Sequence, residues 1–361
     1  MTTDTFFLLL ASLLAVPICW SIPRDFRDDG VALFTFAVLA WLSLISALWL
    51  AVSSCVTVWA LAATRRSRNP NVIYGVAIAV ILFPWLFARE FEAWQMIGAA
   101  YFTLRNLHVL LDGWMDRDGS EVSLREMMHY QFYLPVLTAG PIHRLPTFRR
   151  SLRLRRFDRS EVAVGAERAL LGLAMAAILG TGVMGSVQMR SMDLISNHHP
   201  FLRDWLASVL HWVQLYFVFA GLSGYAVGVS QMMCLNIEEN FNRPFLSSSL
   251  LDFWSRWHIT LSSWCRDYVF QPATAATRRP IVGLTAAMLA IGLWHETSVY
   301  YLLWSSWQVL GIVLNRLLMG LSAELGLTLH ASASKIATPI AILTWLSLAR
   351  PVINLVLGAG Q

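Results

Sequence analysis

The chain has 361 residues, of which 57% are hydrophobic and only 14% are Asp, Glu, Lys or Arg, against about 25% charged residues in a typical soluble domain. This composition excludes an ordinary soluble protein and predicts an all-α integral membrane protein with many spans. The net charge is +5, and in a membrane protein such a balance reports loop orientation rather than nucleic-acid binding.

The N-terminal third contains three apolar stretches. The first, at residues 5–20, lacks the basic start of a cleavable signal, so we expect it to remain as a membrane span. The second, at residues 31–64, exceeds the roughly 20 residues of one span. It predicts two short spans meeting near residues 51–54, or one long tilted helix. The third, at residues 72–87, predicts a span that Pro84 kinks or ends.

Ionisable side chains enter the apolar pattern in the middle of the chain. Residues 94–111 are helical in period but include Arg105 and His108, which either snorkel near a membrane face or face an internal cavity. Residues 132–144 include Pro135, Gly140 and Pro141, which predict a broken or re-entrant segment.

Arginine is concentrated between residues 144 and 159. Such a tract is typical of a cytoplasmic loop held by anionic lipid headgroups, and an acidic partner protein could use the same face. The arginines that we expect to receive a carrier protein are Arg149, Arg150, Arg153, Arg155 and Arg156.

Further apolar stretches follow at residues 162–189, 205–234, 281–318 and 335–357, the last divided or kinked at Pro351. Residues 281–318 are long enough for two spans, with a break at residues 295–298 and a first span too short to cross fully. In total we expect about 9–11 transmembrane helices around a central funnel. They would form a single membrane domain at residues 1–361, with N-terminal helices at 1–92, a core at 93–320 and C-terminal helices at 321–361.

Residues 252–270, DFWSRWHITLSSWCRDYVF, carry more charge than a lipid-facing span tolerates. Read as one helix, the segment places Phe253, Trp257 and Trp264 on one stripe and Arg256 and Asp267 on another. An amphipathic helix lying in the membrane interface explains this pattern, and so does a helix that lines a catalytic cavity.

Two histidines are the best candidates for chemistry, since histidine exchanges protons near neutral pH. His258 lies in WSRWHITLS and His295 in GLWHE, and a packed histidine hydrogen-bonded to a neighbour is the alternative interpretation of each. The sequence has no HExxH, P-loop, GxGxxG or nucleophile-elbow motif, and its four cysteines lack metal-site spacing. We therefore expect no bound metal and no tightly bound cofactor.

Both histidine segments resemble a known family. FWSRWHITLSSWCRDYVF and GLWHETSVYYLLW are similar to the paired signature of the membrane-bound O-acyltransferases, or MBOAT proteins. Residues 216–245, 134–150 and 101–114 also resemble that family. The sequence of residues 216–245 most resembles the bacterial branch that transfers D-alanyl groups in the teichoic-acid pathway. The alginate and peptidoglycan O-acetylases come next.

The resemblance implies a general base, His295, and a second histidine, His258, that places or polarises the reacting groups. It implies an acyl thioester donor, on coenzyme A or on the phosphopantetheine arm of an acyl carrier protein, and a hydroxyl acceptor at the opposite face of a bacterial inner membrane. The partners would be membrane lipid, the carrier and an envelope protein. The residues expected to contact substrate are Trp257, Arg256, Ser262, Asp267, Trp294, Asn242 and Arg105.

The sequence departs from the family pattern at two positions. Glu296 stands where the family usually has Gly, and Val218 stands where the acetylases commonly have Asp. Two other functions stay open, namely a transporter or flippase-like protein and an inactive MBOAT scaffold. Transporters often show inverted repeats, and none is visible in this sequence.

Overall fold

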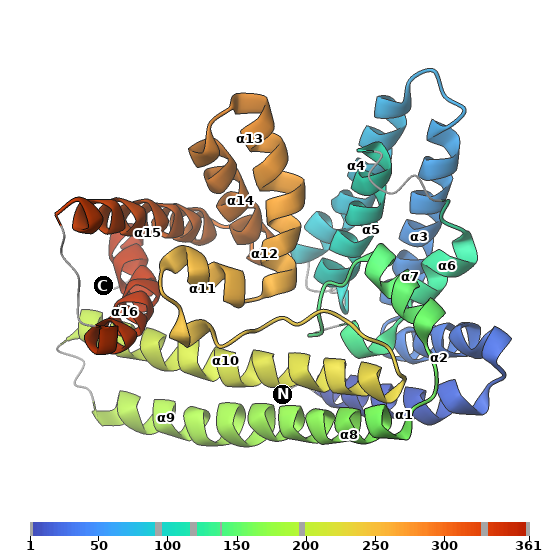
Figure 1. Ribbon diagram of the computed structural model, residues 1–361, viewed down its shortest axis with the longest axis horizontal. Coiled ribbons are helices and arrows are strands. Elements are labelled where there is room, and N and C mark those ends of the chain that lie inside the picture. Colours follow the sequence, from blue (N-terminus) through green and yellow to red (C-terminus); the bar gives the residue numbers. More distant parts are fainter. Residues whose placement is uncertain are drawn as a thin grey trace. The chain divides into compact units, whose positions relative to one another are not determined.

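The computed structural model describes residues 3–90, 96–115, 121–137, 139–194, 199–325 and 331–358 (Figure 1). Regular structure within these ranges is helical, and the β-type pairing there is one bridge between Phe241 and Trp257. The all-α class predicted from composition is therefore confirmed. The chain forms two compact units. Unit 1 comprises Met1–Gly172 and Leu222–Glu238, and unit 2 comprises Leu173–Gly221 and Glu239–Gln361.

Unit 1 is built mainly from the N-terminal helices. Its elements are α1 (Thr3–Ser21), η1 (Arg24–Phe26), α2 (Arg27–Leu42), α3 (Leu44–Thr64), α4 (Pro70–Glu90), α5 (Ala99–Trp114), α6 (Leu124–Gln131), η3 (Leu134–Val136), α7 (Leu145–Leu154), most of α8 (Arg159–Ala174) and the last turns of α10 (Pro200–Met232). Helix α3 packs on α2, α4, α5 and α6, and α1 packs on α2.

The break between α2 and α3 lies at Ser43, so the predicted junction near residues 51–54 is wrong. Ser43 has an extended backbone, and its hydroxyl accepts the N–H of Ser46 at 3.3 Å as the N-cap of α3. Ser53 and Ser54 instead stay inside the helix, where both hydroxyls donate to the carbonyl of Leu50.

Prolines were predicted to interrupt helices at two places in unit 1. Pro84 lies within α4 and does not end it, so the alternative of a kink stays a prediction. Among the described residues between α6 and the start of α7 at Leu145, the regular structure is the short 3₁₀ turn η3, which confirms the predicted break. The hydroxyl of Tyr130 donates to the carbonyl of His143 at 2.6 Å and satisfies part of this non-helical backbone.

Helices α8 and α10 approach closely in unit 1 because glycines lie at their contact. A Cβ at Gly228 would lie 2.5 Å from the backbone nitrogen of Ala169, and a Cβ at Gly165 would lie 2.6 Å from the carbonyl oxygen of Gly228. A Cβ at Gly224 would meet only the Cα of Gly172, at 3.9 Å. Close backbone approach through small residues is the usual mode of helix packing in membranes.

Unit 2 contains the remaining helices. They are η4 (Met175–Met184), which is a π-helix, α9 (Gly185–Leu194), the first part of α10, η5 (Pro244–Leu246), α11 (Leu250–Arg256), α12 (Ile259–Cys265), the π-helix η6 (Arg266–Phe270), α13 (Gln271–Thr277), α14 (Pro280–His295), α15 (Val299–Glu324) and α16 (Ala331–Leu357). Helix α14 packs on α12, η6, α13 and α15, and α15 also packs on α16.

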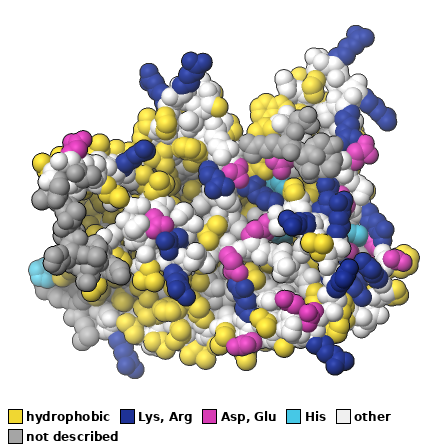
Figure 2. Space-filling model, in the orientation of Figure 1, with side chains coloured by type: hydrophobic (Ala, Val, Ile, Leu, Met, Phe, Trp, Pro, Cys, Tyr) yellow, Lys and Arg dark blue, Asp and Glu magenta, His cyan; other side chains and the backbone are white. Residues whose placement is uncertain are grey.

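In the described part of the chain, seven helices are long and apolar enough to cross a membrane. These candidate spans are Asp4–Ser21, Leu44–Thr64, Pro70–Phe87, Arg159–Ser191, Pro200–Met232, Val299–Ser322 and Ile336–Leu357. Large hydrophobic side chains remain exposed on them, such as Trp59 and Leu170, and Figure 2 shows hydrophobic side chains spread over the displayed face. The chain is therefore a multi-pass membrane protein.

Candidate active site

The segment that carries His258 is not the single helix that its periodicity predicts. Helix α11 ends at Arg256 and α12 begins at Ile259, and His258 between them has φ +44° and ψ 54°. This left-handed conformation is uncommon for a residue other than Gly or Asn. The stripes predicted for residues 252–270 are therefore interrupted at His258.

The residues around Asn240 hold the chain in this conformation. The N–H of Ile259 donates to the carbonyl of Asn240 at 2.9 Å, and the hydroxyl of Thr260 donates to its Oδ1 at 2.6 Å. The N–H of Asn242 donates to the carbonyl of Arg256 at 3.0 Å. The backbone N–H of Ile259 and the carbonyl of Arg256, which the helix break leaves without helical partners, are thus satisfied by Asn240 and Asn242.

His258 is buried between aromatic rings. Its side chain is 4% exposed, with the ring of Phe219 at 4.8 Å and the indole of Trp294 at 5.7 Å between centroids. Neither ring nitrogen has a hydrogen-bond partner among the described residues. Burial, with a smaller contribution from the charge of His295, lowers the pKa of His258 well below its ordinary value. The imidazole is therefore neutral at pH 7.

His295 is the last residue of α14, where the predicted break between two spans is confirmed. Its ring stacks on Tyr301 with centroids 5.4 Å apart and lies 4.8 Å from the indole of Trp294. The side chain is exposed, so the interpretation of a buried histidine holds for His258 and not for His295. His295 lies at the C-terminus of α14, next to the exposed residues that follow the helix.

Trp294 is the residue that joins the two histidines within unit 2. Its indole meets both imidazoles edge to face, and the His258 segment and the His295 segment reach it from α12 and α14, which pack together. The structure thus brings together His258, Trp294 and His295 from the predicted site.

The other predicted residues of the His258 segment support its shape. Trp257 stacks on Phe253 at 5.6 Å between centroids, and Ser262 donates its hydroxyl to the carbonyl of Trp257 at 3.2 Å. Arg256 pairs with Asp252 at 2.8 Å, and Asp267 pairs with Arg266 at 3.0 Å. Asn242 is exposed beside the break.

Arg105 belongs to unit 1, where it is fully buried. Its guanidinium donates to the carbonyls of Tyr130 and Gln131, both at 3.2 Å. These two bonds link α5 to the end of α6. Within unit 1, Arg105 therefore has a structural explanation that does not need a substrate.

The arginine tract divides into buried and exposed members. Arg155 is buried and donates to both carboxylate oxygens of Asp28, at 2.7 and 3.0 Å. Arg149 donates to Glu126 at 3.0 Å and is largely buried. Folding therefore already uses the charges of these two arginines, whereas docking of a carrier on the five arginines stays a prediction. Arg150, Arg153 and Arg156 are exposed.

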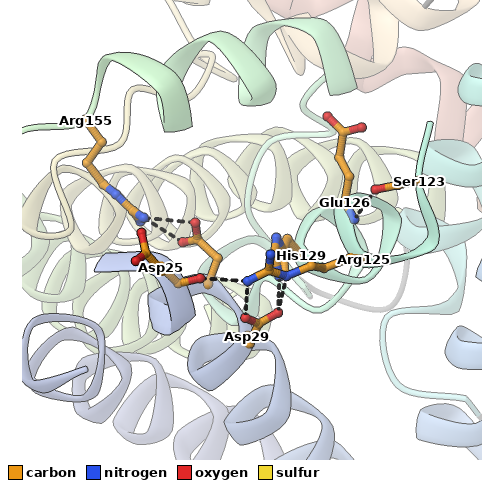
Figure 3. Close-up of polar contacts among 8 residues, drawn as sticks. Asp25, Asp29, Ser123, Arg125, Glu126, His129 and Arg155 are labelled. Carbon is orange, nitrogen blue, oxygen red and sulfur yellow. Dashed lines mark hydrogen bonds and ion pairs between the residues drawn. The ribbon is translucent and has the colours of Figure 1, made fainter. Parts of the chain in front are cut away.

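A polar cluster near Asp28 was not predicted from the sequence. Arg125 and His129 on α6 both contact Asp29 at the start of α2, at 2.9 and 2.7 Å (Figure 3). The hydrogen bond from Arg125 is the main cause that lowers the pKa of Asp29 below its ordinary value. Only the Asp-Asp pair near a helix start could have signalled this cluster in the sequence.

These features define a polytopic membrane protein with a pair of ionisable rings at the ends of broken helices. The pattern of the MBOAT, membrane-bound O-acyltransferase family matches residues 35–358. The chain therefore belongs to the membrane-bound O-acyltransferase family.

Relatives of two kinds match the chain. A probable alginate O-acetylase, AlgI, of Pseudomonas aeruginosa is 28% identical over 229 residues, which cover 62% of this chain and 43% of that protein. The teichoic acid D-alanyltransferase of Bacillus subtilis is 25% identical over 272 residues, 67% of each chain. That of Streptococcus thermophilus is 28% identical over 240 residues, 61% of this chain and 57% of that protein.

The chain spans less than half the length of the alginate O-acetylase that it matches. Identity to the two kinds of relative is nearly the same, at 28% and 25–28%. The similarity therefore gives the family and leaves the acyl group open between its branches.

Proposed function

We propose that this protein transfers an acyl group from a thioester donor to a hydroxyl of a cell-envelope or exported acceptor, with His295 as the general base. The observation that carries the proposal is the contact of His295 and His258 with one indole, Trp294, in a chain of the O-acyltransferase family. The site would lie in a funnel formed by 9–11 helices in a bacterial inner membrane.

In this mechanism a ring nitrogen of His295 takes the proton of the acceptor hydroxyl. The oxygen attacks the thioester carbonyl, the new C–O bond forms, and the C–S bond breaks as the tetrahedral intermediate collapses. The thiolate leaves and takes up the proton that His295 received. The C-terminal end of α14 supports the transient positive charge on His295.

His258 suits a different task. Its ring is neutral and buried, and its N–H has no partner among the described residues. A hydrogen bond from this group to the developing oxyanion would be strong because aromatic rings exclude water around it. We assign His258 to polarisation of the acyl carbonyl and Trp294 to a wall of the same site.

The donor is an acyl-coenzyme A or the acylated phosphopantetheine of a carrier protein. Relatives named teichoic acid D-alanyltransferase and alginate O-acetylase make D-alanyl and acetyl the two groups to test. A carrier protein as the donor is favoured by three exposed arginines, Arg150, Arg153 and Arg156, because an acidic protein is attracted to a positively charged surface.

The mechanism predicts that His295→Ala lowers transfer about 100- to 10,000-fold, the usual contribution of a general base. His258→Asn should also lower kcat, and asparagine is chosen because it adopts the left-handed conformation seen at His258. Transfer of radiolabelled acyl groups by purified protein measures both effects.

His199→Ala is the matched control, since His199 is exposed ahead of α10 and outside the site. It should transfer at the wild-type rate. Wild-type turnover by folded His295→Ala protein would end the mechanism. Substrate uptake into liposomes without an acyl donor would favour a transporter instead.

A further inference from the structure

His258 differs from the other residues of the described chain that adopt a left-handed conformation without being glycine. Cys234, Arg243 and Arg278 share its positive φ, but each of them is half-buried or exposed. Arg278 caps the end of α13, where helices commonly adopt this conformation. His258 lies between two helices with its side chain 4% exposed, so its conformation needs support from the surrounding fold.

The support comes from Asn240 and Thr260, which are 1% and 3% exposed. The hydroxyl of Thr260 donates to Oδ1 of Asn240 at 2.6 Å, and the N–H of Ile259 donates to the carbonyl of Asn240 at 2.9 Å. One asparagine thus binds both of the residues that directly follow His258. These two bonds fix the direction in which the side chain of His258 leaves the backbone.

The segment that contains Asn240 is also linked to the imidazole ring. The ring of Phe241 lies 5.0 Å from that of Phe219, which lies 4.8 Å from His258, between centroids. Phe241 also forms the β-type bridge with Trp257, the residue that precedes His258. Both the backbone and the ring of His258 are therefore held by contacts that begin at residues 240–241.

The orientation of His258 matters because its proposed task is to donate a hydrogen bond to a developing oxyanion. Such a donor contributes most when it is held in place before the reaction, and a misplacement of about 1 Å can cost about 100-fold in rate. Without the hydroxyl of Thr260, the buried Oδ1 of Asn240 would lose its partner. The turn at His258 could then relax toward the right-handed conformation that most residues prefer.

We propose that Asn240 and Thr260 are positioning residues, which hold His258 in its left-handed turn so that its ring faces the reacting groups. The inference rests on the proposed function and deepens it by assigning two residues that act through His258. Neither of them touches the substrate in this assignment.

The test removes one hydroxyl. Thr260→Val keeps the shape of the side chain but not the donor, and we expect kcat to fall about 10- to 100-fold with KM changed less than about twofold. Thr260→Ser keeps a hydroxyl and should restore most of the rate. Transfer of radiolabelled acyl groups by the purified full-length protein measures both. Asn240→Ala removes the same bond from the acceptor side and serves if Thr260→Val fails to fold.

A double-mutant cycle with His258 separates positioning from general damage. His258→Asn keeps a residue that adopts the left-handed conformation but removes the imidazole. In that background Thr260→Val should lower kcat less than about twofold, because the group that it positions is already gone. Equal losses in the His258→Asn and wild-type backgrounds would overturn the proposal, and so would a wild-type kcat in Thr260→Val.

Thr35→Val is the matched control. Thr35 is a fully buried threonine of unit 1, and its hydroxyl donates to the carbonyl of Val31 at 2.8 Å. The variant should keep the wild-type kcat even if its melting temperature falls.

Chemical labelling follows His258 without turnover. The tryptic peptide of residues 257–266 contains His258 as its one histidine, and its carbethoxylation by diethylpyrocarbonate is measured by mass spectrometry. Labelling should be slow in the wild type, because the ring is buried. Thr260→Val should raise the rate about three- to tenfold, since a hydrogen bond that stabilises the buried position is lost. Thr35→Val should leave it unchanged.

The labelling rate also distinguishes this proposal from the proposed function. If His258→Asn transfers acyl groups at the wild-type rate, the catalytic role of His258 fails. The labelling rates then decide whether Asn240 and Thr260 hold the ring. A raised rate in Thr260→Val would support that assignment, and an unchanged rate would overturn it.

Discussion

Arg155 carries a charge that unit 1 buries and neutralises with Asp28, whereas its neighbour Arg156 points to the surface. We predict that Arg155→Ala lowers the free energy of unfolding by about 1–3 kcal/mol, because Asp28 loses its partner at a site with little solvent. Arg156→Ala should change it by less than about 0.5 kcal/mol. Unfolding in detergent, followed by tryptophan fluorescence, measures both.

A further substitution checks the cause of that loss. Asp28→Asn in the Arg155→Ala background should recover part of the stability, since it removes the unpaired carboxylate. If Arg155→Ala and Arg156→Ala are equally stable, the buried pair contributes nothing measurable.

At the scale of single residues, the sequence predicted which side chains lie together better than it predicted their backbone conformation. His258, His295 and Trp294 were predicted and lie together. The left-handed conformation of His258 could not be predicted, because it depends on hydrogen bonds that Ile259 and Thr260 donate to Asn240, a residue outside both helices. Which arginines of residues 149–156 are buried and which are exposed could not be predicted either, because the partners of the buried ones, Asp28 and Glu126, are brought to them only by the tertiary fold.

At the scale of elements, the contact of α8 with α10 depends on Gly228 having no side chain. We predict that Gly228→Ala destabilises the protein by about 1–3 kcal/mol, because its Cβ would meet backbone atoms that cannot move aside. Gly224→Ala, one turn earlier on the same helix, should be nearly neutral, since its Cβ finds an ordinary contact. Melting temperatures compare the two, and equal values would refute the close approach.

The stability that Asp29 contributes by joining α2 to α6 should depend on pH. The pKa of Asp29 is lowered in the fold, so the carboxylate adds stability above the pKa of the unfolded chain, about 4, and loses it as pH falls through the lower folded value. Because Asp29 is partly exposed, we expect roughly 0.2–1 kcal/mol.

Unfolding measured from pH 7 downward tests this link. The wild type should lose its advantage over Asp29→Asn on acidification below about pH 4. A difference between the two proteins that stays constant with pH would show that the carboxylate charge is not involved.

Hydrophobic periodicity located most helices but misplaced some of their ends. The break at Ser43 follows from a serine cap, whereas the serines at 53 and 54, which looked like a break, bond back into their own helix. The split of residues 252–270 came from tertiary contacts that no local pattern records.

At the scale of the whole molecule, composition alone predicted an all-α protein of the membrane, and seven helices long enough to span it are described. The prediction of 9–11 spans includes shorter helices such as α14, which is apolar but has only 16 residues. The cavity of about 320 Å³ lined by Trp212, Trp304 and Arg350 was not predictable, because α10 is distant in the sequence from α15 and α16, which it meets there.

The carrier proposal also belongs to this scale. Replacing Arg150, Arg153 and Arg156 together by Glu should weaken binding of an acidic carrier and remove most of the salt dependence of that binding. Arg66→Glu with Arg68→Glu is the control, since both arginines are exposed between α3 and α4. Surface-bound carrier titrated with each protein measures the affinities. Unchanged affinity in the triple variant would favour coenzyme A as the donor.

The placement of His258 has a consequence for turnover. Both of its ring nitrogens lack a hydrogen-bond partner among the described residues, and the indole of Trp294 meets each imidazole. Among the described residues no hydrogen-bonded relay therefore runs from His258 to His295. In the proposed mechanism His295, which is exposed at the end of its helix, would pass its proton to the departing thiolate or to bulk water. Before each new round of transfer, His295 would thus be deprotonated by a group other than His258.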